Sequence, residues 1–289
     1  MSPSGVNQVS RSFSDRVVVI TGGSSGIGLS LASDLSDQGA HVVIVSHDAL
    51  RLGEAEEALR RSGRNVSVFL CDVRSSEQTA ALAAHVSRTW GRTDILINNA
   101  GYAVYRPFEE STTEEVLDLL DVNLAGAMRC TKAFLPGMLE RRSGRIVNVA
   151  SIGGATIITP NAVYCAAKHG MVAWSLAMRY ELERFGLHVN VVCPGHTSTH
   201  FHDHPTFRRR DADRRPGRRS LTSADVSAAV LDGIRRNRVI TYVPSWHRFL
   251  AWSLRVAPPI TAPIWRYISL KRVDQLYRRM DAERRNRGV

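Results

Sequence analysis

The 289-residue sequence predicts an α/β fold, a doubly wound parallel sheet of about seven strands with helices on both faces. Short apolar runs rich in Val and Ile are spaced along the chain, and helical patterns lie between them. The expected strands are 17–20, 42–45, 66–70, 95–97, 145–149, 189–192 and 239–243. One large domain suffices for this length, and the sequence contains no internal repeat.

The first strand is expected to end in a phosphate-binding turn. Residues 21–28 read Thr-Gly-Gly-Ser-Ser-Gly-Ile-Gly, and a helical pattern follows them. Gly22 permits a tight turn, while Gly26 and Gly28 let a pyrophosphate approach the helix N-terminus, whose free N–H groups attract anions. The spacing G-x-x-x-G-x-G differs from the common G-x-G-x-x-G, and a turn without a ligand is the alternative.

A second motif places a tyrosine four residues before a lysine. The chain has 35 arginines but three lysines, and one of these, Lys168, follows Tyr164. Apolar positions from Val163 to Leu182 recur every three or four residues and Gly186 stands at the expected helix end, so the segment predicts a helix. Residues i and i+4 of a helix share one face, and the phenol and ammonium can therefore act together.

The pair is suited to proton transfer. A free tyrosine has a pKa of about 10, and lowering it by roughly 3 units takes about 4 kcal/mol. One ammonium at about 4 Å supplies about 4 kcal/mol at an effective dielectric near 20. Lys168 alone is therefore expected to bring Tyr164 into the neutral range. Tyr-x-x-x-Lys also occurs by chance on helices, and the phosphate turn is what gives this motif weight.

Other motifs follow the expected strands. Strand 95–97 leads into Asn-Asn-Ala-Gly at 98–101, strand 145–149 leads to Ser151, and strand 189–192 leads to Cys-Pro-Gly at 193–195. Asn123 lies in a helical stretch between the first two. Together with the glycine turn and the Tyr-Lys pair, these motifs resemble the short-chain dehydrogenase/reductase family in its single-domain form, over roughly residues 13–245.

The resemblance implies a Rossmann-type NAD(P)(H)-dependent oxidoreductase that interconverts a ketone and a secondary alcohol. It implies that Tyr164 is the general acid/base, that Lys168 lowers its pKa and holds the nicotinamide ribose, and that Ser151 polarises the carbonyl. Asn123 would position a water of the proton relay, and Asn98 would stabilise the sheet. The implied cofactor-binding residues are Gly22, Ser24, Ser25, Gly26, Ile27, Gly28, Ser46, His47, Asp72, Val73, Asn99, Ala100, Gly101, Tyr164, Lys168, Pro194, Gly195, Thr197 and Thr199.

The second expected strand favours NADP(H) over NAD(H). Relatives that prefer NAD usually carry an acidic residue where Ser46 stands, and those that prefer NADP often carry arginine where His47 stands. The missing acid removes repulsion toward a 2′-phosphate, which His47 or Arg51 could approach. Ser25 argues the other way, because many NADP enzymes carry a basic residue at that place in the turn.

Two other classes of function remain open: a cofactor-sensing or scaffold protein on the same fold, and a nucleotide-sugar epimerase or dehydratase. The intact Asn, Ser, Tyr and Lys set favours the oxidoreductase. Apolar residues at 103–105, with Ile152 and Ile157, suggest a pocket for a hydrophobic ketone or alcohol such as a long-chain 3-oxo lipid, a steroid or a polyketide. A homodimer or homotetramer is expected.

The chain divides into a polar, disordered start at 1–12, a catalytic domain at 13–245 with a substrate lid at 197–221, and an extension at 246–289. Residues 1–12 lack the apolar core of a signal peptide, and the four cysteines lack metal-type spacing, which indicates a reduced cytoplasmic protein. Three histidines alternate at 200, 202 and 204 in the lid, but no metal is expected because hydride transfer needs none.

Positive charge is concentrated in the last third of the chain. Residues 201–289 carry 20 Lys and Arg against 8 Asp and Glu. No nucleic-acid-binding motif accompanies this charge, so nucleic-acid binding is not expected. The extension interleaves aromatic and arginine residues, and its longest uncharged run, 256–265, is too short to span a bilayer. It fits a helix on an anionic membrane surface, or a tail packed on the domain or on a second subunit.

Overall fold

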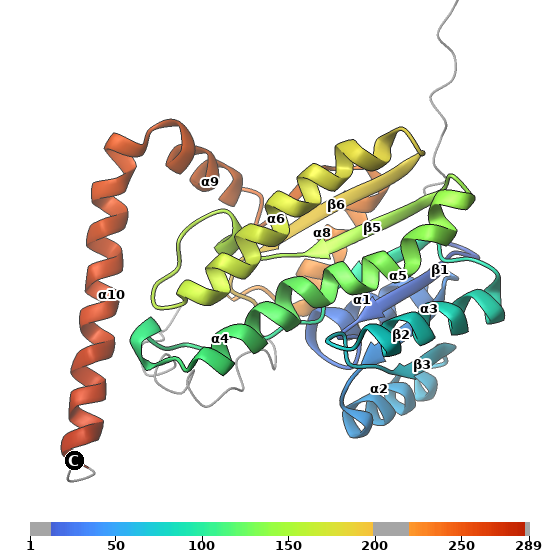
Figure 1. Cartoon of the computed structure of the whole chain (residues 1–289), viewed down its shortest axis with the longest axis horizontal. Helices are drawn as coiled ribbons and strands as arrows, with labels where there is room; N and C mark the ends of the chain where they lie inside the picture. Colours follow the sequence, from blue (N-terminus) through green and yellow to red (C-terminus); the bar gives the residue numbers. More distant parts are fainter. Residues whose placement is uncertain (1–12, 199–219, 287–289) are drawn as a thin grey trace, which may run out of the picture.

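The computed structural model describes residues 13–198 and 220–286, and a parallel seven-stranded sheet forms its centre (Figure 1). The strand order is β3-β2-β1-β4-β5-β6-β7. The strands are β1 Val17–Thr21, β2 His41–Ser46, β3 Val66–Leu70, β4 Ile95–Asn98, β5 Gly144–Val149, β6 Leu187–Pro194 and β7 Ile240–Val243. All seven predicted strands are confirmed, each within two residues of its expected ends, and so is the fold class.

Helices connect the strands and cover both faces of the sheet. The helices of the domain are α1 Gly26–Ser36, α2 Ala49–Arg61, α3 Ser76–Trp90, α4 Thr113–Leu120, α5 Gly126–Glu140, α6 Ala162–Glu183 and α8 Ser223–Arg235. Short turns are η1 Phe108–Glu110, η2 Asp121–Ala125 and η3 Ile152–Gly154. The predicted Tyr-Lys helix is α6, and Gly186 beyond its end adopts the left-handed φ of 74° that ends many helices.

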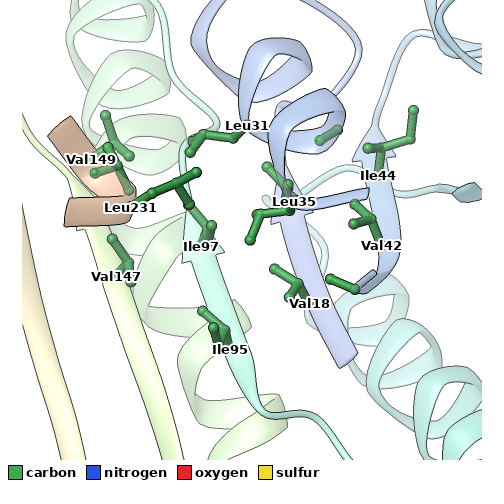
Figure 2. Packing of buried hydrophobic residues seen from close by; sticks show 14 of the residues in the cluster. Val18, Leu31, Leu35, Val42, Ile44, Ile95, Ile97, Val147, Val149 and Leu231 are labelled. Atoms are coloured by element: carbon green, nitrogen blue, oxygen red, sulfur yellow. The ribbon is translucent and has the colours of Figure 1, made fainter. Parts of the chain in front are cut away.

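Alternation along each strand divides the core into two layers. Val18 and Ile20 of β1 pack with α1, α2 and α8, whereas Val17 and Val19 pack with α3, α5 and α6. Figure 2 shows the first layer, where Leu231 lies over strand residues. Because both faces of the sheet are buried, β1, β2 and β4 are apolar over most of their length, which is why they could be recognised in the sequence.

The strand order places a crevice at the carboxyl ends of β1 and β4. The chain leaves β1 for β2 and β3 on one side and returns to β4 on the other, so the connections at these two ends diverge. Asn98, the last residue of β4, is buried, and its Nδ2 donates to Thr131 Oγ1 (3.0 Å) and Asn148 Oδ1 (2.8 Å). These bonds hold β4, β5 and α5 together beneath the crevice, in agreement with the sheet-stabilising role expected of Asn98.

Two helices, α9 His247–Val256 and α10 Pro258–Asn286, follow the last strand. Figure 1 shows α10 as a long helix at one end of the molecule, apart from the sheet. No helix among the described residues is both long and apolar enough to cross a bilayer.

Candidate active site

The glycine turn is held against the end of β4. Gly22 has a φ of 63°, and a Cβ built on it would lie 2.9 Å from Ala100 Cα. A Cβ on Gly28 would collide with the Gly22 carbonyl oxygen. Asn99 Nδ2 donates to the carbonyl oxygens of Thr21 (3.1 Å) and Gly22 (3.0 Å). Only glycine fits at both places, and the turn backbone is fixed where a pyrophosphate would approach.

Helix α1 begins at the turn with an N-terminus suited to an anion. Ser25 occupies the N-cap position but its side chain caps none of the first-turn N–H groups, and this turn contains no acidic residue. Ser24, Gly26 and Ile27 are partly exposed there. The free N–H groups and the helix dipole together favour a phosphate.

The ends of β2 and β3 lie beside this turn. Ser46 is buried, and its Oγ accepts a hydrogen bond from the Asp48 backbone N–H (3.1 Å). His47 is exposed, whereas Arg51 pairs with Asp48, at 3.4 Å between Nε and Oδ2. Of the two basic side chains considered for a 2′-phosphate, Arg51 is therefore already engaged with a carboxylate. His47 is the better placed of the two.

Asp72, which the family resemblance assigns to the adenine of the cofactor, is engaged by Arg74. The guanidinium donates to both Asp72 carboxylate oxygens and also to Asp118 Oδ1 of α4 (2.6 Å). The Tyr102 hydroxyl donates to Asp118 Oδ2 (2.6 Å). The Arg74 hydrogen bond lowers the pKa of Asp72, and the Tyr102 hydrogen bond does the same for the pKa of Asp118. This network links the adenine side of the crevice to the loop after β4.

Ser151, Tyr164 and Lys168 lie at the carboxyl end of β5. Ser151 follows this strand and its Oγ accepts from the Gly153 backbone N–H (3.0 Å), which fixes its direction. Tyr164 and Lys168 project from α6 and are both buried. A hydrogen bond joins the Tyr164 phenol to Ser151, and Lys168 Nζ donates to the Val149 carbonyl oxygen (3.1 Å).

Asn123 borders the same space and lies in the π-turn η2, between helices α4 and α5. Its Nδ2 donates to the carbonyl oxygens of Tyr102 (2.9 Å) and Leu119 (3.0 Å), while its buried Oδ1 has no donor among the described residues. A Cβ built on Gly101 would lie 2.5 Å from Oδ1 and 3.5 Å from Lys168 Nζ. An acceptor and an ammonium thus border one small region, and π-turns of this kind are common at functional sites.

The pKa values run against the simplest sequence argument. Burial raises the pKa of Tyr164, and the Ser151 hydrogen bond opposes this shift. Burial lowers the pKa of Lys168 to about 8, and Lys168 Nζ lies 5.8 Å from the centroid of the phenol ring. Desolvation therefore opposes the shift of the Tyr164 pKa that was expected from Lys168 alone.

The remaining expected site residues lie at the carboxyl end of β6 and in the segment that follows it. Pro194 ends β6, and the Gly195 N–H donates to the Val243 carbonyl oxygen (2.7 Å). A Cβ on Gly195 would lie 2.5 Å from the His247 ring of α9. Thr197 is buried, and its Oγ1 donates to the Gly195 carbonyl oxygen (3.1 Å). Thr199, the lid histidines and most of the expected lid lie outside the described residues.

A small hollow of about 20 Å³ opens beside Tyr164. It lies between the loop after β4, helix α4 and the start of α6, and Val104, Val116 and Leu119 contribute apolar walls. Arg106 and Glu115, paired at 2.8 Å, add charge at its edge. The residues lining it are Val104, Arg106, Phe108, Ser111, Glu115, Val116, Leu119, Asn161, Ala162, Val163 and Tyr164.

The expected pocket residues behave differently from one another. Ala103 and Tyr105 are buried in one apolar cluster with Tyr164, as a pocket beside the phenol requires. Ile157 is instead largely exposed, so it does not form a closed wall. All four cysteines are buried free thiols, in agreement with the sequence analysis. No metal-binding cluster of His, Cys, Asp and Glu occurs within 13–198 and 220–286.

Comparison with known proteins identifies the scaffold. The profile of the short chain dehydrogenase family matches residues 16–207. The chain belongs to the short-chain dehydrogenase family. It is thereby an oxidoreductase of the class that acts on CH–OH groups, and a nicotinamide cofactor belongs to its fold.

Individual members of the short-chain dehydrogenase family show how far the similarity extends. Ketoacyl reductase HetN from Nostoc sp. is 38% identical over 183 residues, which cover 63% of this chain and 64% of that protein. Estradiol 17-beta-dehydrogenase 1 from Rattus norvegicus is 39% identical over 193 residues, which cover 65% of this chain and 56% of that protein. A structure of an actinorhodin polyketide ketoreductase variant with NADPH has 35% identity and a TM-score of 0.71, covering 79% of this chain and 95% of that one.

Sequence reasoning missed residues that this short-chain dehydrogenase uses to build its site. Thr21 Oγ1 accepts from the backbone N–H groups of Asn99 and Ala100, and the Thr21 in the turn was the available signal. Arg74 and Tyr102 were missed because a charge network between distant segments leaves no local pattern. The contact of α9 with Gly195 was also missed, because nothing in the sequence places the extension against the site.

Proposed function

We propose that this protein reduces a hydrophobic ketone to a secondary alcohol, or catalyses the reverse, with NADP(H). The observation that carries the proposal is the convergence of Ser151, Tyr164, Lys168 and Asn123 on one buried space, beside a hollow with apolar walls and a charged edge. The nicotinamide, when bound, supplies or accepts the hydride. Tyr164 Oη transfers the proton to or from the substrate oxygen.

The other three residues support that proton transfer. Ser151 Oγ, held by the Gly153 N–H and hydrogen-bonded to the phenol, donates to the substrate oxygen when substrate binds and orients it beside Tyr164. Lys168 binds the ribose and offers positive charge to the phenolate. Asn123 Oδ1 has the unmet acceptor capacity that a relay water would use. The same inventory disfavours a scaffold protein, because a scaffold has no use for a buried ammonium whose desolvation costs stability.

The preference for NADP(H) rests on the end of β2. Ser46 is small and brings no negative charge, and exposed His47 stands beside it. Asp48 also lies near this end, but Arg51 pairs with it and offsets its charge. A 2′-phosphate would therefore meet a site that is not repulsive. One similar structure, the actinorhodin ketoreductase variant, holds NADPH and another neighbour holds NAD, so the proposed preference rests on this chain's own residues.

The substrate class follows from the walls beside Tyr164. Buried Ala103, Tyr105 and Leu119 share its cluster, and the hollow continues this apolar surface. A long-chain 3-oxo lipid, a polyketide or a steroid fits such walls. The names of two relatives, a ketoacyl reductase and an estradiol dehydrogenase, refer to substrates of these kinds. A nucleotide sugar would instead need several hydrogen-bond partners for its hydroxyl groups.

The decisive experiment combines a ketone panel with one substitution. Consumption of NADPH is measured by its absorbance with 3-oxoacyl thioesters and steroid ketones as substrates. Conversion of a nucleotide sugar is followed by chromatography of the product, because epimerisation or dehydration consumes no NADPH overall. Tyr164→Phe should lower kcat at least about 100-fold, the usual value of general acid/base catalysis, while the Kd for NADPH stays nearly constant. A variant that retained more than a tenth of the activity would contradict the assigned role of Tyr164. Turnover of the nucleotide sugar alone would contradict the substrate class.

We further propose that the extension attaches the protein to anionic membranes. Phe249, Trp252 and Val256 recur at helical spacing and are all exposed on α9. Ile260, Ile264 and Tyr267 form a second exposed stripe on α10. Residues 246–273 of the extension include five Arg and Lys but no Asp or Glu. Exposed apolar area and basic charge are the two attractions of peripheral membrane binding, and each basic residue near the surface adds roughly 1 kcal/mol.

Sedimentation with vesicles containing phosphatidylserine at low salt tests this attachment. The double substitution Phe249→Ala and Trp252→Ala should reduce the bound fraction strongly, because it removes two exposed aromatic side chains without opening the core. Tyr180→Ala, which truncates an exposed aromatic residue of α6, is the matched control and should bind like the wild type. If the wild type does not sediment with the vesicles, the membrane proposal is wrong and the exposed stripes bind protein instead. Light scattering would then detect the proposed homodimer or homotetramer.

A further inference from the structure

Two side chains near the end of α10 differ from the rest of that helix. Leu276 and Met280 are each 3% exposed, whereas Ile260, Ile264 and Tyr267 of the same helix are more than half exposed. Leu276 and Met280 are spaced i and i+4, so they lie on one face. The helix lies beyond residues 16–207, which match the family profile.

These two side chains are buried in an apolar cluster that includes Tyr164. They belong to one apolar cluster with Ala103, Tyr105, Leu119, Tyr164 and Ala167. Within that cluster, Leu119 and Tyr164 also line the hollow beside the phenol, and partly buried Val104 and Val163 do the same. The cluster that buries α10 is thus continuous with the wall of the hollow.

We propose that Leu276 and Met280 form part of the substrate-binding wall, and that Met280 limits the length of the apolar chain the site accepts. The inference rests on the proposed ketone reduction and names a specificity determinant within it. Methionine is unbranched and adaptable, so it can shape a wall that contacts an acyl chain or ring system. Truncation of Met280 would open space next to the cluster, which a longer substrate could fill.

The test compares substrates of increasing length. kcat/KM is measured with NADPH for a series of 3-oxoacyl thioesters, for the wild type and for Met280→Ala. The ratio of kcat/KM for the longest to the shortest substrate should rise about tenfold or more, since each methylene in an apolar pocket is worth about 10-fold or more in discrimination. The KM for NADPH should stay constant because the cofactor turn is elsewhere.

Two matched variants separate a wall from a mere anchor. Met138→Ala makes the same truncation at a fully buried residue of α5 that belongs to a different apolar cluster, and Tyr277→Ala alters an exposed neighbour on α10. Both should leave the length ratio unchanged. The proposed wall would be contradicted if Met280→Ala lowered kcat/KM equally for substrates of every length. It would also be contradicted if Met138→Ala changed the ratio of kcat/KM for long and short substrates as much as Met280→Ala does.

The failure of this inference can be told from failure of the proposed function. If the wild type turns over no ketone, calorimetric binding of the same thioesters in the presence of NADP+ ranks their lengths without chemistry. Tighter binding of the longer members by Met280→Ala would then uphold the wall while ketone reduction fails. If wild type and Met280→Ala rank substrates of different length in the same order, the proposed wall is wrong, even where the wild type is an active reductase.

Discussion

Gly101→Ala would place one methyl group in the space shared by Asn123 and Lys168. Its Cβ would lie 2.5 Å from Asn123 Oδ1 and 3.5 Å from Lys168 Nζ. Asn123 is fully buried and held by hydrogen bonds to Tyr102 and Leu119, so it cannot retreat without breaking them. A buried polar group left without its partner costs about 1–3 kcal/mol, and we expect the free energy of unfolding to fall by about that amount.

Activity should fall with stability in this variant. Displacing Asn123 by a strain of about 1–3 kcal/mol corresponds to a roughly 5- to 150-fold lower kcat if the proton relay needs its present position. The assays are urea unfolding and NADPH-coupled turnover. Gly53→Ala is the control, because nothing lies within 4 Å of its added Cβ in helix α2; it should stabilise by about 0.5–1 kcal/mol.

A second substitution isolates the clash. Asn123→Ala in the Gly101→Ala background removes the oxygen that the methyl group meets, so stability should recover in part while kcat stays low. Residues in contact show such coupling, whereas independent ones add. Unchanged kcat and stability in Gly101→Ala would refute the reasoning. The added methyl group and Asn123 Oδ1 could not then be as close as the structure has them.

Two other predictions concern cofactor and charge. Ser46→Asp should reverse the preference for NADPH over NADH in Kd titrations followed by nicotinamide fluorescence, because a carboxylate repels a 2′-phosphate; tighter NADH binding by the wild type would contradict it. Burial lowers the pKa of Lys168 from 10.5 to about 8, so the folded protein binds fewer protons than the unfolded one between those values. Stability therefore rises with pH across that window, and Lys168→Met should stabilise the protein below pH 8, by up to about 3 kcal/mol, with the difference fading toward pH 10.5. A melting-temperature difference between wild type and variant that does not change with pH would count against the buried charge.

The sequence was most informative where burial and chemistry are local. The strands were recognised because both of their faces are buried, which makes Val17 to Ile20 or Val42 to Val45 continuous apolar runs. Gly22 and Gly28 were recognised because the backbone itself requires glycine there. The position of a lysine one helical turn after Tyr164 needed no tertiary information at all.

Energies that depend on the whole environment were less accessible. The sequence predicted the sign of the attraction between Lys168 and Tyr164, but the desolvation that dominates both pKa values depends on every layer packed around them. In the same way, Arg74 joins Asp72 to Asp118 across 44 positions of the chain, counted from Arg74 to Asp118. Such a contact exists only after the fold has brought β3 and α4 together.

The extension shows why its two interpretations were hard to separate from composition. The same helix α10 exposes Ile260, Ile264 and Tyr267 near its start and buries Leu276 and Met280 near its end. An apolar residue every three or four positions fits both surfaces, since each is a helix face. If both proposals hold, one rigid helix joins a membrane-facing stripe to the wall beside Tyr164, so a substrate dissolved in lipid would meet the enzyme where its pocket is built. Phe249→Ala with Trp252→Ala should then lower turnover of a vesicle-bound ketone while leaving a water-soluble ketone unaffected, whereas Met280→Ala should alter the length preference for both.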